Sequence, residues 1–297
     1  MAMPKKVLML VENLSVPADP RVWREACTLA QCGYEVSIIC PKGETRDKES
    51  YICIENIHIY RYRLVVAASA PAGYIKEYGA AMLMTFILTF KVLVQRGFDV
   101  IHAANPPDMF FMIGLFYRLL GKKYIFDQHD LAPEMFLVKF QGRRQWLCKI
   151  LYLLEYCSYK TADVVITTNE SQKKVAMQRG HCPEEKVFIV RNGPDLARYV
   201  AMTPNPALKR GKRYMLAYVG VMGSQDGVEY ALHALAELVH QRERKDVTLV
   251  LMGDGDQVPL LQELTHMLNL DDYVYFAGWL TREEMLRYLV VSHLWDR

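Results

Sequence analysis

The sequence has 297 residues, of which 52% are hydrophobic and 23% are charged. This composition excludes a disordered or fibrous chain, and the length is sufficient for two globular domains. The formal net charge of +3 is modest, and no helix-turn-helix, zinc-finger or RNA-binding signature accompanies it, so we expect no nucleic acid partner.

The cysteines and the start of the chain bear on cellular location. Seven cysteines are scattered without a C-x-x-C pair, which predicts reduced thiols rather than disulfides or zinc ligands. The start "MAMPKKVLMLVENLSV" becomes polar too soon for a secretory signal. We therefore expect a cytoplasmic protein.

The first part of the chain alternates short apolar runs with segments of helical spacing. It opens as β-α-β, with "KKVLMLVE" (5–12), "RVWREACTLAQCGY" (21–34) and "EVSIIC" (35–40). This alternation predicts a doubly wound α/β fold with parallel sheets covered on both faces. Further strands are predicted at "FDVIHA" (98–103), "KKYIFDQHD" (122–130), "ADVVITTNE" (162–170) and "KVFIVRNG" (186–193).

One apolar segment, "GAAMLMTFILTFKVLV" (79–94), is similar in composition to a membrane span. It is shorter than the roughly 20 residues that a span needs, and Lys91 interrupts it. The sequence therefore predicts a buried helix here.

A second β-α series follows a stretch rich in proline and basic residues. We predict a first domain over 1–200, a linker over 201–213 and a partial second domain over 214–297. The chain ends after three predicted strands, so we expect either a very small domain or a chain that is cut short. These strands are "RYMLAYVG" (213–220), "VTLVLMGDG" (247–255) and "DYVYFAGW" (272–279).

The stretch "YVGVMGSQDGVEYALHAL" (218–235) is an apolar run that breaks on three glycines and resumes at helical spacing. A strand, a tight glycine turn and a helix start aim unpaired N–H groups at an anion, and the helix dipole favours negative charge there. We expect Gly220, Gly223, Ser224, Gln225 and Gly227 to bind phosphate. The alternative is an ordinary turn in which glycine serves only the backbone conformation.

Together these motifs resemble the family-4 retaining glycosyltransferases of the GT-B fold. The resemblance rests on "PADPRVWREACTLAQCGYEVSIICP", "HAANPPD", "DQHDLAPE", "VRNGPD", the glycine stretch and "LMGDG", in that order. It implies two Rossmann-like domains, of which the second binds a nucleotide-sugar donor. It also implies relatives of the bacterial surface-polysaccharide type, in which no catalytic metal or other cofactor is expected.

The chain departs from the family pattern at two places. The family carries G-[RK]-x-x-x-x-K-G at the phosphate loop, but Val221 and Asp226 occupy the two cation positions. The chain also ends before the region of the family's E-x-x-x-x-x-x-x-E pair. Glu229 and Glu237 have the same spacing, but they follow the phosphate loop directly and we interpret them as a solvated helix face.

The resemblance also suggests roles for residues that follow other predicted strands. It implies that His129 faces the donor sugar and that Asp130 orients it or shapes the loop; a buried, satisfied histidine is the alternative. Asn105 and Asp108 either contact the acceptor or cap a helix. By family position Arg191, Asn192 and Gly193 lie near the hinge and donor cleft, where Arg191 could replace a missing cation; a simple turn remains open.

Residues 137–160 combine basic and aromatic side chains. They lie in the more basic part of the chain: residues 1–206 hold 26 Lys and Arg against 20 Asp and Glu, whereas residues 207–297 hold 10 Lys and Arg against 13 Asp and Glu. Such a stretch predicts contact with an anionic membrane surface, or simply a solvated helix face. The residues concerned are Lys139, Phe140, Arg143, Arg144, Trp146 and Lys149.

The sequence therefore favours a retaining hexosyltransferase that moves a sugar from a nucleotide donor, by family habit a UDP-sugar, to a glycan or polyprenyl-linked acceptor in polysaccharide or lipopolysaccharide biosynthesis. Two alternatives remain. One is a truncated, non-catalytic remnant that binds acceptor, membrane or a partner. The other is an NAD-dependent enzyme, which is disfavoured because no G-x-G-x-x-G follows the first strand.

Overall fold

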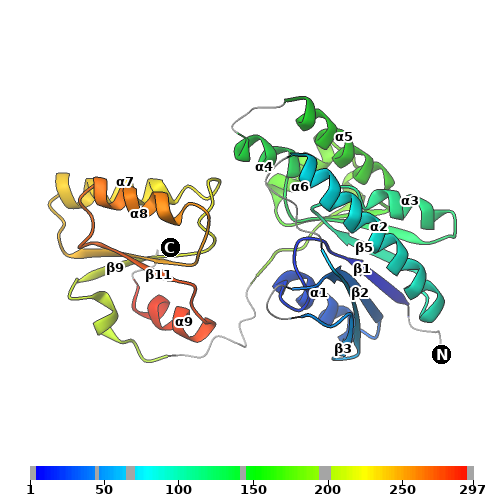
Figure 1. Cartoon of the computed structure of the whole chain (residues 1–297), viewed down its shortest axis with the longest axis horizontal. Helices are drawn as coiled ribbons and strands as arrows, with labels where there is room; N and C mark the ends of the chain where they lie inside the picture. Colours follow the sequence, from blue (N-terminus) through cyan, green and yellow to red (C-terminus); the bar gives the residue numbers. More distant parts are fainter. Residues whose placement is uncertain (1–4, 44–46, 65–70, 141–144, 194–201, 293–297) are drawn as a thin grey trace. The chain divides into compact units, whose positions relative to one another are not determined.

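The computed structural model describes residues 5–43, 47–64, 71–140, 145–193 and 202–292. The chain divides into two compact units, Met1–Gly193 and Pro194–Arg297. In each unit helices pack on both faces of a sheet, as Figure 1 shows. The predicted α/β fold with doubly wound sheets is confirmed.

Eight strands form the sheet of the first unit in the order β3-β4-β2-β1-β5-β6-β7-β8. Every neighbouring pair is parallel except β3 with β4. Side chains alternate across β1, so that Leu8 and Leu10 enter one core and Val7 and Met9 enter the other. The strands are β1 (Lys6–Leu10), β2 (Glu35–Pro41), β3 (Tyr51–Ile54), β4 (Ile57–Tyr62), β5 (Val100–Ala104), β6 (Lys123–Gln128), β7 (Val164–Thr167) and β8 (Val187–Ile189).

The strand series predicted from the sequence missed the β3–β4 hairpin. Its two turn residues, Glu55 and Asn56, both have positive φ, 51° and 63°. Left-handed backbone at both positions is the geometry of a type I′ turn, which matches the twist of the strands that it joins. The alternation in "YICI" and "IHIY" around a two-residue turn was the available signal.

Helices cover both faces of this sheet. Helix α1 packs over one face through Val22 and Ala26. Helices α2, α3, α5 and α6 contribute to the core on the other face (Figure 1). The helices are α1 (Pro20–Gln31), α2 (Pro71–Gln95), α3 (Phe111–Arg118), α4 (Ala132–Lys139), α5 (Gln145–Thr161), α6 (Glu170–Gln178) and the short 3₁₀ helix η1 (Glu184–Lys186).

The prediction that residues 79–94 form a buried helix was wrong in its burial. These residues lie in α2, and only one side of the helix packs on the sheet. Large apolar side chains on the other side are exposed, Leu83 by 58% and Val94 by 84%. A mean hydropathy cannot tell which side of a helix meets the core, because both sides here are apolar.

The second unit has a three-stranded parallel sheet in the order β11-β10-β9. Helices α7 and α8 pack on one face around Leu249 and Leu251, and α9 packs on the other around Met215 and Val250. The elements are η3 (Pro206–Lys209), β9 (Tyr214–Val219), α7 (Val228–Ala236), the π-helical turn η4 (Glu237–Gln241), β10 (Val247–Met252), α8 (Val258–Met267), β11 (Val274–Gly278) and α9 (Arg282–Val291).

The segment predicted as a linker over 201–213 belongs to the second unit over its described part, 202–213. Its 3₁₀ helix η3 packs against α9, and Leu208 contacts the apolar core on that face. Asn205 caps η3, with its side chain accepting from the Ala207 N–H. Proline and basic residues thus begin a packed element here.

Candidate functional site

The order of strands locates a candidate site in the first unit. Strand order reverses between β1 and β5, and open α/β sheets bind ligands beyond the carboxyl ends of the strands at such a switch point. Glu12 follows β1, Asn105 follows β5, and His129 and Asp130 follow β6. The structure therefore gathers three of the predicted residues at this edge.

Asn105 joins the loops that follow β5 and β6. Its Oδ1 accepts from the backbone N–H groups of His129 at 2.6 Å and Asp130 at 3.1 Å. Its Nδ2 donates to Asp130 O and to Asp108 Oδ1, both at 2.8 Å. Asn105 and Asp108 are buried, and the amide of Asn105 uses both donors and both acceptor positions. Asn105 therefore positions the loop that carries His129.

A buried arginine orients the imidazole of His129. His129 Nε2 lies 2.9 Å from Asp127 Oδ2 and 2.9 Å from Arg21 Nε. This ring nitrogen donates to Asp127 when it is protonated and accepts from Arg21 when it is not, so both tautomers keep the ring in place. Arg21 also donates to Asp127 Oδ1 at 2.9 Å and to Val190 O at 3.0 Å.

Local sequence explains why Arg21 reaches this edge. Asp19 is the N-cap of α1, with Oδ1 accepting from the N–H groups of Arg21 and Val22 at 3.0 Å each, and Pro20 occupies the first helical position. Both choices fix a helix start. The side chain of Arg21 leaves the first turn, directly beside the end of β6.

The charge cluster extends to Glu25 and His102, which sequence reasoning missed together with Arg21 and Asp127. Burial and the Asp127 carboxylate raise the pKa of Glu25. Burial alone would lower the pKa of His102, but Asp127 and Glu25 outweigh it and raise this pKa. Burial would likewise raise the pKa of Asp127, yet hydrogen bonds from His102 and His129 hold it well below its usual range. These contacts span the chain, so no local motif signals them.

Three ligand atoms of this cluster are close enough to hold a metal ion. Side-chain atoms of Glu25, His102 and Asp127 lie within 4.8 Å of one another. However, Arg21 already places a guanidinium nitrogen 3.1 Å from Glu25 and 2.9 Å from Asp127. A cation thus neutralises these carboxylates, and a metal ion would have to displace it. The cluster fits an orienting network better than a metal centre.

Glu12 is a further candidate that the sequence analysis missed. The side chain is buried at the switch point, and its Oε1 has no hydrogen-bond partner among the described residues. Burial, and then the charge of Glu77, raise the pKa of Glu12 to about 7. A carboxyl group with a pKa near neutrality at a ligand edge is a candidate for proton exchange.

Helix α1 also holds the end of the first unit. Arg21 donates to Val190 O, and Arg24 donates to Gly193 O and to Asn192 Oδ1. Arg191, Asn192 and Gly193 are exposed. The predicted hinge residues thus contact the same helix that supplies Arg21 to His129.

In the second unit the glycine stretch lies between β9 and α7, as predicted. Gly220 directly follows β9 and donates its N–H to Met252 O at 3.1 Å, and Gly227 is the N-cap of α7 with a φ of 66°. Ser224 and Gln225 are exposed in the turn. The first turn of α7 presents the N–H groups of Val228 and Glu229, which have no partner within a helix. This is an anion-binding geometry.

Asp226 alters this anion site. Its Oδ2 accepts from the Gly223 N–H at 2.8 Å, so a carboxylate of the chain already occupies one of the amides predicted to bind phosphate. Asp226 stands where the family pattern has a cation, and it adds negative charge to the loop. An anion at this loop would therefore have to bind through the remaining amides, or displace the Asp226 carboxylate.

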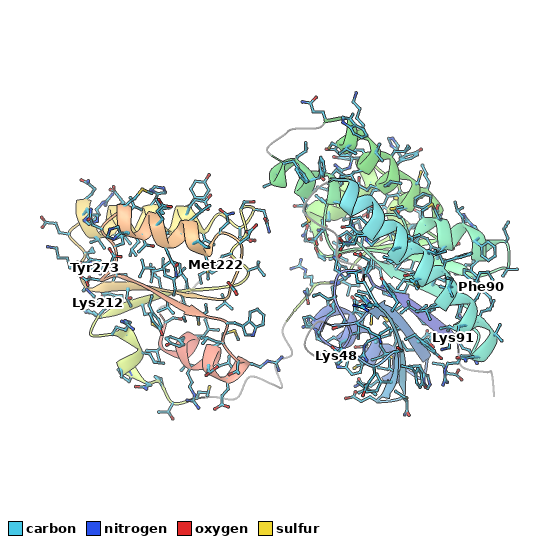
Figure 2. The ribbon with its side chains drawn as sticks, viewed as in Figure 1. Lys48, Phe90, Lys91, Lys212, Met222 and Tyr273 are labelled. Carbon is cyan, nitrogen blue, oxygen red and sulfur yellow. The ribbon has the colours of Figure 1, made fainter. Side chains whose placement is uncertain are left out.

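The "GDG" loop after β10 supports the glycine stretch. Met222 is buried between the sheet and its helices; its N–H donates to Asp254 O at 2.9 Å. A Cβ atom at Gly253 would lie 1.9 Å from Gly220 O, and one at Gly255 would lie 2.3 Å from Met222 O. Both glycines are needed because two backbones meet here. Met222 is labelled in Figure 2.

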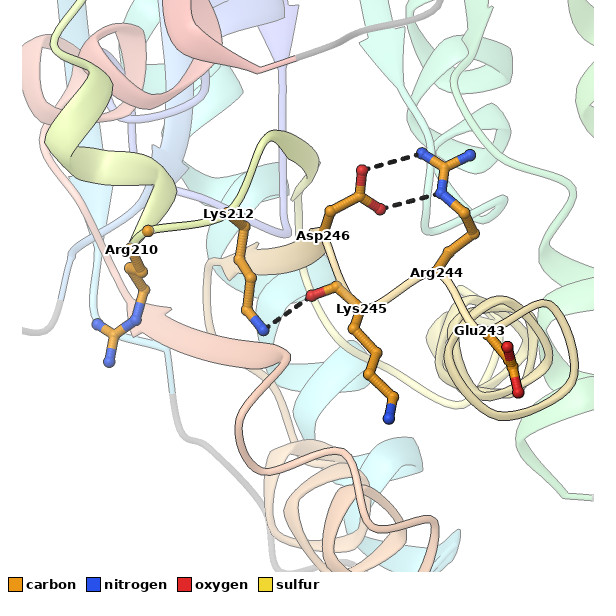
Figure 3. A pocket seen from close by; sticks show the side chains of 7 residues that line it. Arg210, Lys212, Glu243, Arg244, Lys245 and Asp246 are labelled. Carbon is orange, nitrogen blue, oxygen red and sulfur yellow. Dashed lines mark hydrogen bonds and ion pairs between the residues drawn. The ribbon is translucent and has the colours of Figure 1, made fainter.

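A hollow of about 810 Å³ opens at the other end of the second sheet, where β9 and β10 begin (Figure 3). Lys212 donates to Lys245 O, and Arg244 pairs with Asp246. Lys212 also lies over the ring of Tyr273. These cations lie at the amino ends of the strands, opposite the edge where this fold class binds ligands, and they are engaged with their neighbours. We do not place the donor there.

The membrane-contact stretch 137–160 is partly described. Trp146 and Lys149 are exposed on α5, whereas Arg143 and Arg144 lie outside the described residues. Phe140 packs against Phe136, with ring centroids 4.5 Å apart.

Comparisons of sequence match both units to glycosyltransferases. Residues 21–198, more than half of the chain, match the model of Glycosyltransferase Family 4, and residues 213–294 match the model of Glycosyl transferases group 1. An uncharacterized glycosyltransferase of Methanocaldococcus jannaschii is 26% identical over 86% of this chain. A chitobiosyldiphosphodolichol beta-mannosyltransferase of Debaryomyces hansenii is 24% identical over 59% of it. The chain spans 64% and 38% of the lengths of these relatives.

Comparisons of structure give the GT-B fold. Sucrose-phosphate synthase from Thermosynechococcus elongatus superposes with a TM-score of 0.70 and 17% identity, covering 97% of this chain and 74% of that one. The Anabaena protein HepE, in complex with UDP and glucose, superposes with a TM-score of 0.65 and 15% identity, covering 95% and 71%. With the family model matched over most of the first unit, the chain belongs to Glycosyltransferase Family 4.

Proposed function

We propose that this protein transfers a sugar from a nucleoside diphosphate donor, with UDP as the nucleotide, to a glycan or lipid-linked acceptor. Family membership supports the transfer, and a structural neighbour that holds UDP and glucose supports the donor class. A relative named for a diphosphodolichol acceptor supports a lipid-linked acceptor. A structural neighbour described as a glycosyltransferase involved in lipopolysaccharide biosynthesis supports a role in polysaccharide or lipopolysaccharide synthesis. The observation that carries the proposal is the anion-binding turn between β9 and α7.

The donor diphosphate would lie at the carboxyl edge of the second sheet. Backbone N–H groups would bind it, namely those of Ser224, Gln225, Gly227, Val228 and Glu229. The dipole of α7 also favours negative charge at the start of the helix. As the sugar–phosphate bond breaks, charge grows on the leaving diphosphate, and fixed amides stabilise it without reorganisation. Arg191 is a candidate for the missing cation.

In the first unit, His129 would contact the transferred sugar, held by Asp127, Arg21 and Asn105. Asp130 would orient the sugar or shape the loop, and Asp108 would contribute to the acceptor side. We propose a retaining reaction in which the acceptor hydroxyl attacks from the face that the diphosphate leaves. The leaving phosphate takes the hydroxyl proton, so that neither a protein base nor a metal ion is required.

Calorimetric titration with UDP, GDP and ADP tests the donor site. We expect UDP to bind and Gly223→Trp to abolish binding, because the indole would fill the turn. Lys245→Ala, in the hollow at the opposite edge, is the matched control and leaves binding unchanged. Asp226→Asn is expected to tighten binding about fivefold, since it removes a competing anion.

Failure of all three nucleotides to bind the wild-type chain would contradict the donor assignment. It would instead favour a non-catalytic protein that binds acceptor, membrane or a partner. Equal binding by Gly223→Trp would place the nucleotide elsewhere in the chain.

A further inference from the structure

Helix α2 is apolar on both of its sides. Ala81, Thr85 and Thr89, spaced by one turn, are buried against the sheet of the first unit. Leu83, Ile87, Phe90 and Val94 form a second stripe at the same spacing, and Met84 lies beside it; all five are exposed. Residues 77–95 are long and apolar enough to cross a membrane by length and composition. Because one stripe packs on the sheet, the helix lies along the surface of the unit and does not stand free to span.

Helix α3 continues this surface. The ring of Phe116 lies 5.1 Å from that of Phe86 and 5.5 Å from that of Phe90, measured between centroids, so the two helices are side by side. Figure 2 labels Phe90 and Lys91 on α2. The exposed apolar side chains of α3 and its following turn are Met112, Leu115, Phe116, Leu119 and Leu120.

Helix α5 packs against α3 and adds a third stripe. Trp146, Ile150 and Leu153 recur at intervals of four and three residues, and Tyr156 follows one turn later; all are exposed. We call the exposed apolar residues of α2, α3 and α5 the apolar face. Contiguous apolar surface of this extent marks a site of interaction with a membrane or another protein.

Charge on these helices has one sign. The exposed charged residues of α2, α3 and α5, within the side chains that the structure describes, are Lys91, Arg118, Lys149 and Lys160. None is acidic; Glu77 is partly buried and Glu155 is fully buried. Lys122 and Lys123 follow α3; Asp99 pairs with Lys122, and Asp163 pairs with Lys123 and, at 3.9 Å, with the half-exposed Arg118. An apolar face with cations and without exposed carboxylates on its helices is complementary to an anionic lipid surface.

We propose that the apolar face seats the first unit on an anionic membrane. Leu83, Ile87, Phe90, Leu115, Leu119 and Trp146 enter the boundary between head groups and acyl chains, while Lys91, Arg118, Lys149 and Lys160 meet lipid phosphates. The proposal extends the membrane contact expected from 137–160 to α2 and α3. It goes beyond sugar transfer, because the seating depends on neither nucleotide nor His129.

Flotation with lipid vesicles tests this seating. We expect the protein to float with vesicles of phosphatidylcholine and phosphatidylglycerol, and at least about tenfold less with phosphatidylcholine alone. The double variant Leu83→Gln/Ile87→Gln lowers binding about tenfold, because two anchors are lost. Lys91→Gln/Lys149→Gln lowers binding to the anionic vesicles only.

Leu260→Gln/Met267→Gln is the matched control. These residues are exposed on α8 of the second unit, by 56% and 64%, so the pair removes the same kind of side chain from another surface. Vesicle binding is unchanged in this variant. Circular dichroism shows whether each variant is folded. UDP titration separates this test from that of the donor site, because we expect the variants to bind UDP as the wild type does.

Two results would overturn the seating. One is wild-type protein that does not float with anionic vesicles; the other is equal loss of binding in the α8 control. If the wild type does not float and gel filtration shows a dimer that the Leu83→Gln/Ile87→Gln variant dissociates, the face joins two copies of the chain instead.

Discussion

The two carboxyl edges of this protein are built by different means. In the first unit, buried side chains hold the edge: Arg21, Asp127 and Asn105 tie His129 in place. In the second unit, main-chain contacts hold the edge: Gly220 lies against Gly253, and Met222 lies against Asp254 and Gly255. The structure of the first edge therefore depends on particular charged side chains and on the side-chain amide of Asn105. The second depends on the absence of side chains, and it can offer N–H groups to a ligand.

We expect the largest loss of stability from a substitution at the backbone edge of the second unit. Gly253→Ala should destabilise the second unit by more than about 4 kcal/mol, because its Cβ would lie 1.9 Å from Gly220 O in a backbone with a φ of 135°. Gly211→Ala is the control, also with positive φ but in open space, and should cost about 1 kcal/mol. Urea unfolding of both variants gives the difference; similar losses would refute the close packing of the loops.

We expect the next largest loss of stability from a substitution at the side-chain edge of the first unit. Arg21→Ala should lower the free energy of unfolding by about 3 to 4 kcal/mol, because it leaves the buried Asp127 carboxylate without its cation. Adding Asp127→Asn should restore part of this loss. Arg287→Ala, which removes a surface pair with Glu283, should change little. If denaturant unfolding showed no recovery in the double variant, the charge argument would fail.

Removal of the amide clamp should have a somewhat smaller effect. Asn105→Ala leaves the N–H groups of His129 and Asp130 without their acceptor, at a cost of about 2 to 3 kcal/mol. Asn105→Asp keeps that acceptor but places a carboxylate beside Asp108, so we expect it to retain only part of the stability. Thermal and urea unfolding measure both; an Asn105→Ala variant as stable as the wild type would contradict the clamp.

Titration of Glu12 should give the smallest effect on the free energy of unfolding. The effect should change with pH in the opposite direction to that of a carboxylate paired with a cation. The folded pKa of about 7 exceeds the ordinary value of 4.5, so between these values the folded state binds more protons. The contribution of Glu12 to the free energy of unfolding is then greatest at low pH and falls by about 2 kcal/mol between about pH 5.5 and about pH 7.5. Glu12→Gln should flatten this slope in unfolding measurements; an unchanged slope would assign it to other groups.

Local patterns predicted the fold well. Short apolar runs located every strand except β3 and β4, and the three glycines placed the turn before α7, because such signals lie within a few residues. The β3–β4 hairpin escaped notice because Glu55 and Asn56 are not the usual Asn-Gly turn. Nothing local distinguishes the outward stripe of α2 from a buried one.

The candidate site was harder to predict. His129 and Asn105 follow predicted strands, so their position at the edge could be inferred, but the hydrogen bonds between them join residues 24 positions apart. Arg21 meets Asp127 across 106 residues. Such pairs form only after the sheet assembles, and one sequence does not record them. Asp226 was recognised as a departure, but its bond to the Gly223 N–H required the folded turn.

Hydrogen exchange of backbone amides with and without UDP tests the central claim most directly. We predict that UDP slows exchange in residues 224–229, where the turn and the start of α7 offer N–H groups, and leaves residues 210–213 and 243–246 at the opposite edge unchanged. Protection confined to the opposite edge, or absent from 224–229 under saturating UDP, would contradict a donor site built from backbone.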